Sequence, residues 1–194
     1  MEIGATKAVQ DRLKTTKIEE SKGASLVFCW DTHLTKIKGR NVLFIVNASN
    51  RYTIAMTDIE PRNWNYYTMY ISSVIHGVMQ EMGYSEAQIG QYFKMSGDTI
   101  VTKTHGRKSV GGINRMVMDA QYFGKKLEKE AKYQWELSEY LNRDICQPEG
   151  FDTYGYPSEL FKLDMERLGI AAKRKPAKII DFTKYIDTNR STNH

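Results

Sequence analysis

The stretch SLVFCWDTHLTKIKGRNVLFIVNASNRYTIAMTDI, residues 25–59, is rich in β-branched and aromatic residues and decides the fold class. Such residues pack well on a half-buried pleated surface and are enriched in strands. Polar and glycine-containing breaks divide the stretch into three segments. We therefore predict strands over Ser25–Leu34, Asn41–Ala48 and Arg51–Ile59.

The second and third of these strands are separated by a connection short enough for a hairpin. Ser49 and Asn50 stand at the turn, where asparagine tolerates the left-handed conformation that tight turns need. The middle strand is apolar on both faces over residues 42–46, as is typical of a central strand covered on both sides. Residues 52–57 alternate instead, which predicts one less buried face for the third strand.

After residue 60 the apolar period becomes that of a helix. The spacing predicts helices over residues 61–83, 85–97, 111–124, 128–143 and 157–168, and one further strand at Thr99–Lys103. A short strand at the N-terminus leads into a helical turn that ends at Leu13. The fold class is therefore α+β: an antiparallel sheet of about four to five strands, from the N-terminal half and the 99–103 segment, packed with several amphipathic helices.

The chain has 194 residues, a length that fits one ordinary domain with its own core. Its formal net charge is +5, and residues 171–194 carry six basic and two acidic side chains of that balance. The other residues hold 22 basic and 21 acidic side chains and are nearly neutral. We predict a single domain over residues 1–170 and a basic C-terminal tail over 171–194 that is extended or disordered.

Cysteine usage and hydropathy indicate where the protein is located. The two cysteines, Cys29 and Cys146, lie far apart and belong to no CxxC pair or zinc-type cluster, so we expect free thiols in a reducing compartment. The charged N-terminus has no apolar secretion segment, and no later run approaches the length of a membrane span. We expect a cytoplasmic protein with no membrane partner, no cofactor and no metal.

The strongest local signal is the stretch TKTHGRKS, residues 102–109, followed by Gly111 and Gly112. It combines a strand end, a cationic turn and a helix start, and free backbone N–H groups at a helix start favour anions. A phosphate-binding P-loop is excluded, because the glycines do not stand at the required positions. The alternative is a solvated turn without a ligand. The candidate ligand-binding residues are Thr102, Lys103, Thr104, Arg107, Lys108, Ser109, Gly112 and Asn114.

A second group of candidates lies in the first long strand and the hairpin. Alternation places Cys29, Asp31 and His33 on one face of that strand, and a carboxylate beside an imidazole can tune a general base. The alternative is a hydrogen-bonded pair at an exposed strand end, and no nucleophile or third ligand is evident. The secondary candidates are Asp31, His33, Asn47, Arg51 and His105; the catalytic residues stay unknown.

Several pieces of the chain together resemble a bacterial family known only as a domain of unknown function. They cover most of residues 1–170 and are Ile3–Lys7 with Leu13, Phe28–Leu34, Val46–Asn47 with Arg51–Tyr52, Thr102–Thr104, Arg107, Ser109, Gly112, Asn114 and Leu141–Arg143. Relatives carry His near position 31 and Asn near 33, whereas Asp31 and His33 stand here. The resemblance implies a compact bacterial domain and supplies no activity.

Three functions are compatible with these features. The first is a non-enzymatic module that binds a phosphate-bearing ligand, a nucleotide or nucleic acid, at the 102–114 junction, with the basic tail adding affinity. The second is a hydrolase or transferase acting on a phosphorylated small molecule, with His33 or His105 as its base. The third is an antitoxin-like or regulatory subunit that uses the aromatic-rich second half to contact a protein partner. The first is favoured, because the sequence holds no complete catalytic set. The oligomeric state stays open.

Overall fold

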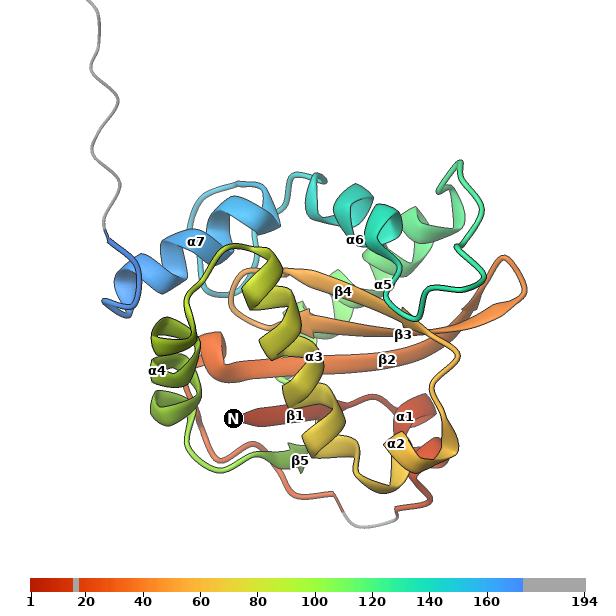
Figure 1. The fold of residues 1–194 in the computed structure, drawn as a ribbon, viewed down its shortest axis with the longest axis horizontal. Coiled ribbons are helices and arrows are strands. Elements are labelled where there is room, and N and C mark those ends of the chain that lie inside the picture. The colour runs from red at the N-terminus through yellow and green to blue at the C-terminus, as the bar shows by residue number, and fades with distance from the viewer. Residues whose placement is uncertain (16–17, 173–194) are drawn as a thin grey trace, which may run out of the picture.

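A computed structural model describes residues 1–15 and 18–172 (Figure 1). The strands are β1 (Glu2–Ala5), β2 (Cys29–Ile37), β3 (Arg40–Asn47), β4 (Thr53–Thr57) and β5 (Ile100–Thr102). The helices are α1 (Lys7–Leu13), α2 (Pro61–Asn65), α3 (Tyr67–Glu81), α4 (Glu86–Ser96), α5 (Gly106–Gln121), α6 (Trp135–Asn142) and α7 (Pro157–Arg167). The predicted α+β class is confirmed, and the 173–194 part of the predicted tail lies outside the described residues.

The five strands form one sheet in the order β4-β3-β2-β1-β5. β2, β3 and β4 are antiparallel neighbours, as predicted, but β1 runs parallel to both β2 and β5. The sheet is therefore mixed, and the prediction of a purely antiparallel sheet was wrong. A parallel pair needs a long crossover, which the segment containing α1 supplies between β1 and β2.

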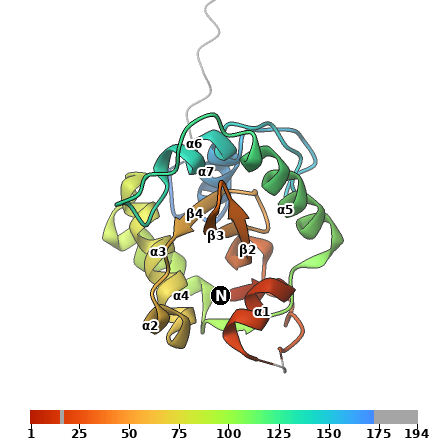
Figure 2. The same cartoon turned by 90° about the vertical axis from the view of Figure 1, so that its right-hand side faces the viewer.

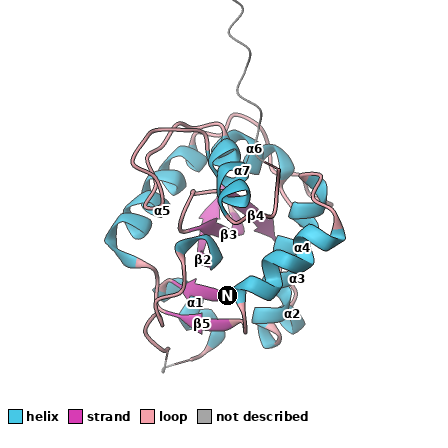
Figure 3. Ribbon diagram, turned by 90° about the vertical axis from the view of Figure 1, so that its left-hand side faces the viewer, coloured by secondary structure: helices cyan, strands magenta, loops and turns pink. Residues whose placement is uncertain are grey.

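Helices cover both faces of the sheet. Figure 2 shows α2, α3 and α4 on one side of the strands and α5 on the other, with α6 and α7 near the β4 end. Figure 3 shows the same layers from the opposite side. Leu43 and Ile45 of β3 join one core cluster, with Ile71 and Ile75 of α3. The alternate residues Val42, Phe44 and Val46 join a second cluster that includes Ile113 and Met116 of α5. β3 is thus the two-sided central strand that its apolar run predicts.

Strand β4 is buried on both faces and its outer edge is covered, whereas its alternating sequence predicted one less buried face. Every residue of β4 is buried. Asn142 of α6 accepts a hydrogen bond from the Thr53 N–H and donates one to the Thr53 carbonyl, each at 2.8 Å. The hydroxyl of Ser138 accepts from the Ala55 N–H at 3.0 Å. Side chains of α6 therefore satisfy backbone groups that an edge strand otherwise exposes.

Several predicted boundaries are corrected. α5 begins at Gly106 rather than at Gly111, and residues 128–134 lie outside the helix that was predicted over 128–143. The predicted 61–83 helix is divided at Tyr66 into α2 and α3. In the hairpin, Arg51 takes the left-handed conformation, with φ 63°, instead of Asn50. The side chain of Asn50 accepts from the Tyr52 N–H at 2.9 Å, which stabilises this turn.

Within residues 1–15 and 18–172 there is no helix with the length and apolar character needed to span a membrane.

Candidate functional site

The start of α5 is organised around the buried carboxylate of Asp31. Asp31 lies on β2 and is fully buried. Its Oδ1 accepts a hydrogen bond from the His105 backbone N–H at 3.2 Å, and its Oδ2 accepts one from the Ser109 hydroxyl. An anion is favourable at the N-terminus of a helix. In this protein that position is taken by a carboxylate of the chain itself.

The imidazole of His105 bridges two carboxylates. Its Nδ1 lies 2.7 Å from Asp31 Oδ1, and its Nε2 lies 3.0 Å from Glu2 Oε2. The side chains of all three residues are at most 4% exposed. Burial by itself lowers the pKa of His105, but the hydrogen bonds and charges of Asp31 and Cys29 outweigh it and raise that pKa to about 10. The ring is therefore held as an imidazolium between two acids.

Glu2 is bound from its other side by backbone groups. Its Oε1 accepts hydrogen bonds from the N–H groups of Lys22, at 2.9 Å, and Ala24, at 3.4 Å. Burial acts to raise the pKa of Glu2, but hydrogen bonds from Ser21, His105 and these backbone groups together lower it. Glu2 therefore stays ionised, with Oε2 directed at His105.

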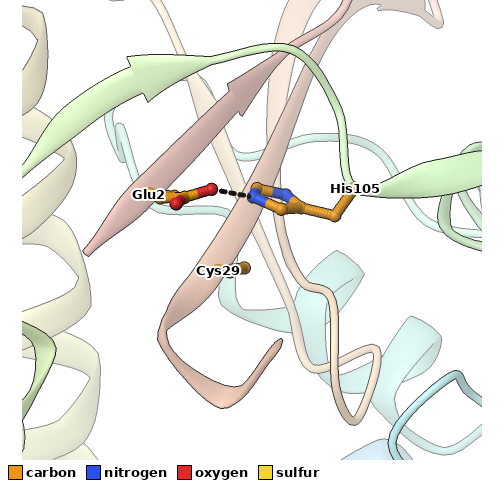
Figure 4. A group of neighbouring side chains, drawn as sticks. All are labelled: Glu2, Cys29 and His105. Atoms are coloured by element: carbon orange, nitrogen blue, oxygen red, sulfur yellow. Dashed lines mark hydrogen bonds and ion pairs between the residues drawn. The ribbon is translucent and has the colours of Figure 1, made fainter. Parts of the chain in front are cut away.

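Cys29 lies beside Glu2 and His105, and Figure 4 shows these three side chains in close-up. One ligand-type atom each of Glu2, Cys29 and His105 lies within 4.8 Å of the other two, and all three residues are buried. They come from β1, from the start of β2 and from the loop before α5 (Figure 4). We call Glu2, Cys29, Asp31, His105 and Ser109 the buried polar cluster.

Gly4 allows this cluster to form. In the parallel register of β1 and β2, Gly4 is the partner of Asp31. A Cβ atom on Gly4 would lie 1.8 Å from Asp31 Oδ1 and 3.0 Å from the Thr104 backbone. Asp31 therefore occupies the space that any other side chain at position 4 would need.

A second feature is a cleft beside the first half of α5, with a volume of about 360 Å³. It lies between α5, the β3–β4 hairpin and the loop around Pro148. We call it the basic cleft, because its charged lining residues are Arg51, Lys108, Arg115 and the single acid Glu149. The other lining residues are Ala48, Ser109, Gly111, Gly112, Gln147 and Pro148.

The predicted ligand-binding residues do not converge on one point. Lys108, Ser109 and Gly112 line the basic cleft. Thr102 is fully buried, and Lys103 points elsewhere to form an ion pair with Glu20. The remaining three predicted residues are Thr104, which is partly buried, and Arg107 and Asn114, which are exposed; none of them lines the cleft.

The secondary candidates separate as well. Asp31 and His105 meet in the buried polar cluster and Arg51 enters the basic cleft. The Nδ1 of His33 lies 3.2 Å from the Thr6 hydroxyl. The carbonyl oxygen of the Asn47 side chain accepts from the Ser49 N–H at 3.0 Å and so shapes the hairpin. Of the secondary candidates, Asp31 and His105 therefore belong to the buried polar cluster and Arg51 belongs to the basic cleft. His33 and Asn47 belong to neither site.

The sequence did not indicate Glu2 as a site residue. For Cys29 it indicated only that this residue shares a face of its strand with Asp31. Both cysteines are free and buried. The alternation of β2 correctly indicated that Cys29 and Asp31 share a face. No spacing motif indicates Glu2, because it joins the group only through the parallel pairing of β1.

The fold and the buried polar cluster define the protein as a mixed-sheet α+β domain in which a buried histidine links two strands to the start of a helix. The chain belongs to a family described as a domain of unknown function (DUF6933), which matches residues 2–160. The resemblance drawn from the sequence is thus confirmed. No curated protein and no solved structure shows significant similarity to the chain.

Proposed function

We propose that this domain is a non-enzymatic cytoplasmic binding module for a phosphate-bearing ligand, a nucleotide or nucleic acid, and that the ligand occupies the basic cleft. The observation that carries the proposal is the charge of the lining, in which Arg51, Lys108 and Arg115 outnumber the one acid, Glu149. Clustered cations around a concave surface attract polyanions. Relative to the sequence prediction, the site moves from the tip of the 102–114 junction to the side of α5.

The cations of the cleft keep donors for a ligand. Arg51 donates one hydrogen bond from Nη2 to the Gly112 carbonyl at 3.0 Å. Lys108 donates to the Pro148 carbonyl at 3.2 Å, and Arg115 donates from Nε to Asp119 at 3.2 Å. A guanidinium carries five N–H donors and an ammonium carries three, so these contacts use only part of their capacity. The contacts orient the cations and leave donors for phosphate oxygens.

Two glycines keep the helix surface open beside these cations. A Cβ atom on Gly112 would lie 3.2 Å from the Arg51 Nε, so glycine lets the guanidinium lie directly against α5. Gly111 is exposed and also lines the cleft, so no side chain at that position narrows the cleft.

The test is a binding titration of the full chain with ATP and with a fluorescently labelled single-stranded oligonucleotide, at low and high salt. We expect binding that weakens with salt, because each neutralised phosphate releases counterions. Lys108→Glu and Arg115→Glu should each weaken binding about tenfold, which corresponds to about 1.4 kcal/mol. Neither substitution removes a buried contact, since both side chains are more than half exposed.

Two control variants make the same charge change elsewhere. Lys94→Glu alters an exposed position on α4, away from the cleft, and should leave binding within twofold. Lys103→Glu distinguishes a ligand bound in the cleft from a ligand bound at the tip of the 102–114 junction, because Lys103 pairs with Glu20 and does not line the cleft. Absence of binding at low salt would overturn the proposal, and so would equal losses in Lys94→Glu and Lys108→Glu.

A hydrolase or transferase has less support. A general base needs a free lone pair near neutral pH, whereas both ring nitrogens of His105 face carboxylates and its pKa is raised to about 10. His33 is partly buried, and its Nδ1 is hydrogen-bonded to the hydroxyl of Thr6. The geometry therefore favours binding over catalysis with either predicted base.

A protein-interaction role is the second candidate, because aromatic side chains are exposed in the second half of the chain. Trp135 is 48% exposed and Tyr140 is 43% exposed, and both line a hollow of about 530 Å³. Aromatic residues are enriched in protein interfaces. Co-purification from the native host should recover a partner with the wild-type chain and lose it with the Trp135→Ala, Tyr140→Ala double variant. Equal recovery with both chains would argue against this surface.

A further inference from the structure

We propose that Glu2, Cys29 and His105 bind one divalent transition-metal ion of the zinc class. None of these three residues lines the basic cleft, and the proposal does not depend on the proposed function. One sulfur, one imidazole nitrogen and one carboxylate oxygen make up the donor set. Thiolate, imidazole and carboxylate are the three side-chain ligands that zinc uses in proteins.

The three donors already stand at nearly the separation that one ion requires. Their ligand atoms lie within 4.8 Å of one another, and Glu2 Oε2 is 3.0 Å from His105 Nε2. Bonds to zinc of about 2.0–2.3 Å in tetrahedral geometry place ligand atoms about 3.3–3.8 Å apart. Side-chain adjustments of about 1 Å therefore suffice, and the backbone of the two strands can stay in place.

The residues around the three donors hold and orient them by hydrogen bonds, as the residues behind the ligands of a metal site do. Asp31 Oδ1 lies 2.7 Å from His105 Nδ1, so a ring that has lost one proton keeps the other on Nδ1 and leaves Nε2 to face Glu2 and Cys29. A carboxylate that orients a histidine from behind is the usual support of a zinc ligand. Asp31 is itself held by the Ser109 hydroxyl and the His105 N–H. These supports distinguish the cluster from a chance meeting of three polar residues.

Glu2 is supported in the same way. Its Oε1 accepts from the Lys22 N–H at 2.9 Å, so Oε2 is the oxygen turned towards the other two donors. All three donors are buried, which excludes competing water from most of the site.

The charge balance of the ion with its ligands is also favourable. The ion takes its place between the donors as the thiol of Cys29 and the Nε2 of His105 release their protons to solvent. A dication then meets one thiolate and one carboxylate, so the ion and its three ligands are together neutral. Among the residues that the structure describes, the group has three members, so the fourth position in a tetrahedral site belongs to water or an added ligand.

The experiment is a titration of the untagged, chelator-treated full chain with Co²⁺, followed by competition with Zn²⁺. Co²⁺ bound to a thiolate gives a ligand-to-metal charge-transfer band in the near ultraviolet. We expect the band to saturate at one ion per chain and to disappear when Zn²⁺ is added. The melting temperature should rise with either ion, because a metal that binds only the folded state stabilises it.

Variants assign the ligands. Cys29→Ser should abolish the charge-transfer band, whereas Cys146→Ser, at the other buried cysteine, should leave the band and the stoichiometry unchanged. Asp31→Asn should weaken binding about 10–100-fold while keeping the band, as expected of a supporting residue. If Cys29→Ser does not fold, an unchanged band in Cys146→Ser still assigns the sulfur to Cys29.

Two results would overturn the proposal. One is the absence of saturable binding of Co²⁺ and Zn²⁺ by the wild-type chain. The other is a charge-transfer band that persists in folded Cys29→Ser or vanishes in Cys146→Ser. The Lys108→Glu variant should bind Co²⁺ like the wild type, so failure of the phosphate proposal and failure of the metal proposal are distinguishable.

Discussion

At the scale of single residues, Gly4 and Asp31 show how one close approach organises the interior. Asp31 is fully buried, and its oxygens accept hydrogen bonds from His105 and Ser109. It fits there because Gly4, its partner on β1, has no side chain. The sequence around either residue does not show this contact, since Gly4 and Asp31 become neighbours only through the pairing of β1 and β2.

Gly4→Ala is expected to destabilise the protein by about 1–3 kcal/mol or more, the usual cost of overpacking a well-packed interior. The added Cβ would lie 1.8 Å from Asp31 Oδ1, and the Thr104 backbone blocks a compensating shift. Urea unfolding measures the change. Gly90→Ala is the matched control, because a Cβ atom at that exposed helical position meets nothing within 4 Å. It should stabilise by about 0.5–1 kcal/mol; equal effects of the two substitutions would contradict the packing argument.

His33 is expected to make stability fall in acid. Burial lowers the pKa of His33 below its ordinary value of 6.5, so the folded state binds the proton less well than the unfolded state. The stabilising contribution is therefore present above pH 6.5 and is lost as the pH falls through the lowered pKa. Because the Thr6 hydroxyl donates to the Thr32 carbonyl at 3.0 Å, the neutral ring donates from Nδ1 to Thr6.

The comparison is between wild type and His33→Gln, whose amide can donate the same hydrogen bond without titrating. The free energy of unfolding of each protein is measured at pH 8 and at pH 5. Wild type should lose more stability than the variant over this range. Identical losses would mean that His33 titrates alike in the folded and unfolded chains.

At the scale of elements, the cover on β4 is a second case in which position in the sheet overrides local pattern. The alternation of residues 52–57 is typical of a strand with one exposed face. In the fold, α6 and the segment before it lie along this strand, and every residue of β4 is buried. Asn142 and Ser138 supply hydrogen bonds to Thr53 and Ala55 that a neighbouring strand would otherwise supply.

Asn142→Ala is therefore expected to cost about 2–4 kcal/mol. It leaves the buried N–H and C=O groups of Thr53 without their partner, and each such group costs about 1–3 kcal/mol. The loss is measured by denaturant unfolding. Asn114→Ala, on the exposed face of α5, is the control and should change stability by less than about 0.5 kcal/mol. A loss below 1 kcal/mol in Asn142→Ala would show that β4 does not need this cover.

At the scale of the whole molecule, the sheet brings distant segments together. β1 lies between β2 and β5, so the first residues of the chain reach the loop before α5. Glu2, Cys29 and His105 meet for this reason alone. The basic cleft forms similarly, where the hairpin around Arg51 meets the side of α5 that carries Lys108 and Arg115.

Removing residues 173–194 tests whether charge outside the described fold assists the basic cleft. The removed segment carries +4 of the formal net charge of +5. The truncated chain should bind the oligonucleotide more weakly, with a shallower dependence of log affinity on log salt, because fewer counterions are released. An unchanged salt slope would mean that residues 173–194 do not contribute to binding of the oligonucleotide.

The sequence by itself determined the class of most elements and one central feature of the sheet. The apolar run over residues 42–46 predicted the two-sided strand β3, and the helix predicted over residues 85–97 agrees with α4, whose N-cap is Ser85. These features depend on neighbours along the chain, so local patterns carry them. Asp31 and His105 were also secondary candidates, and Ser109 was a candidate of the 102–114 junction.

Tertiary structure alone decided which candidates meet. The parallel pairing of β1 brought Glu2 and Gly4 to β2, and the start of α5 at Gly106 turned His105 and Ser109 towards Asp31. Strand order and direction are set by the burial of whole faces and by the length of crossovers, which no short window of sequence contains. The residue types of both candidate sites can therefore be read along the chain, whereas their combination is a property of the folded sheet.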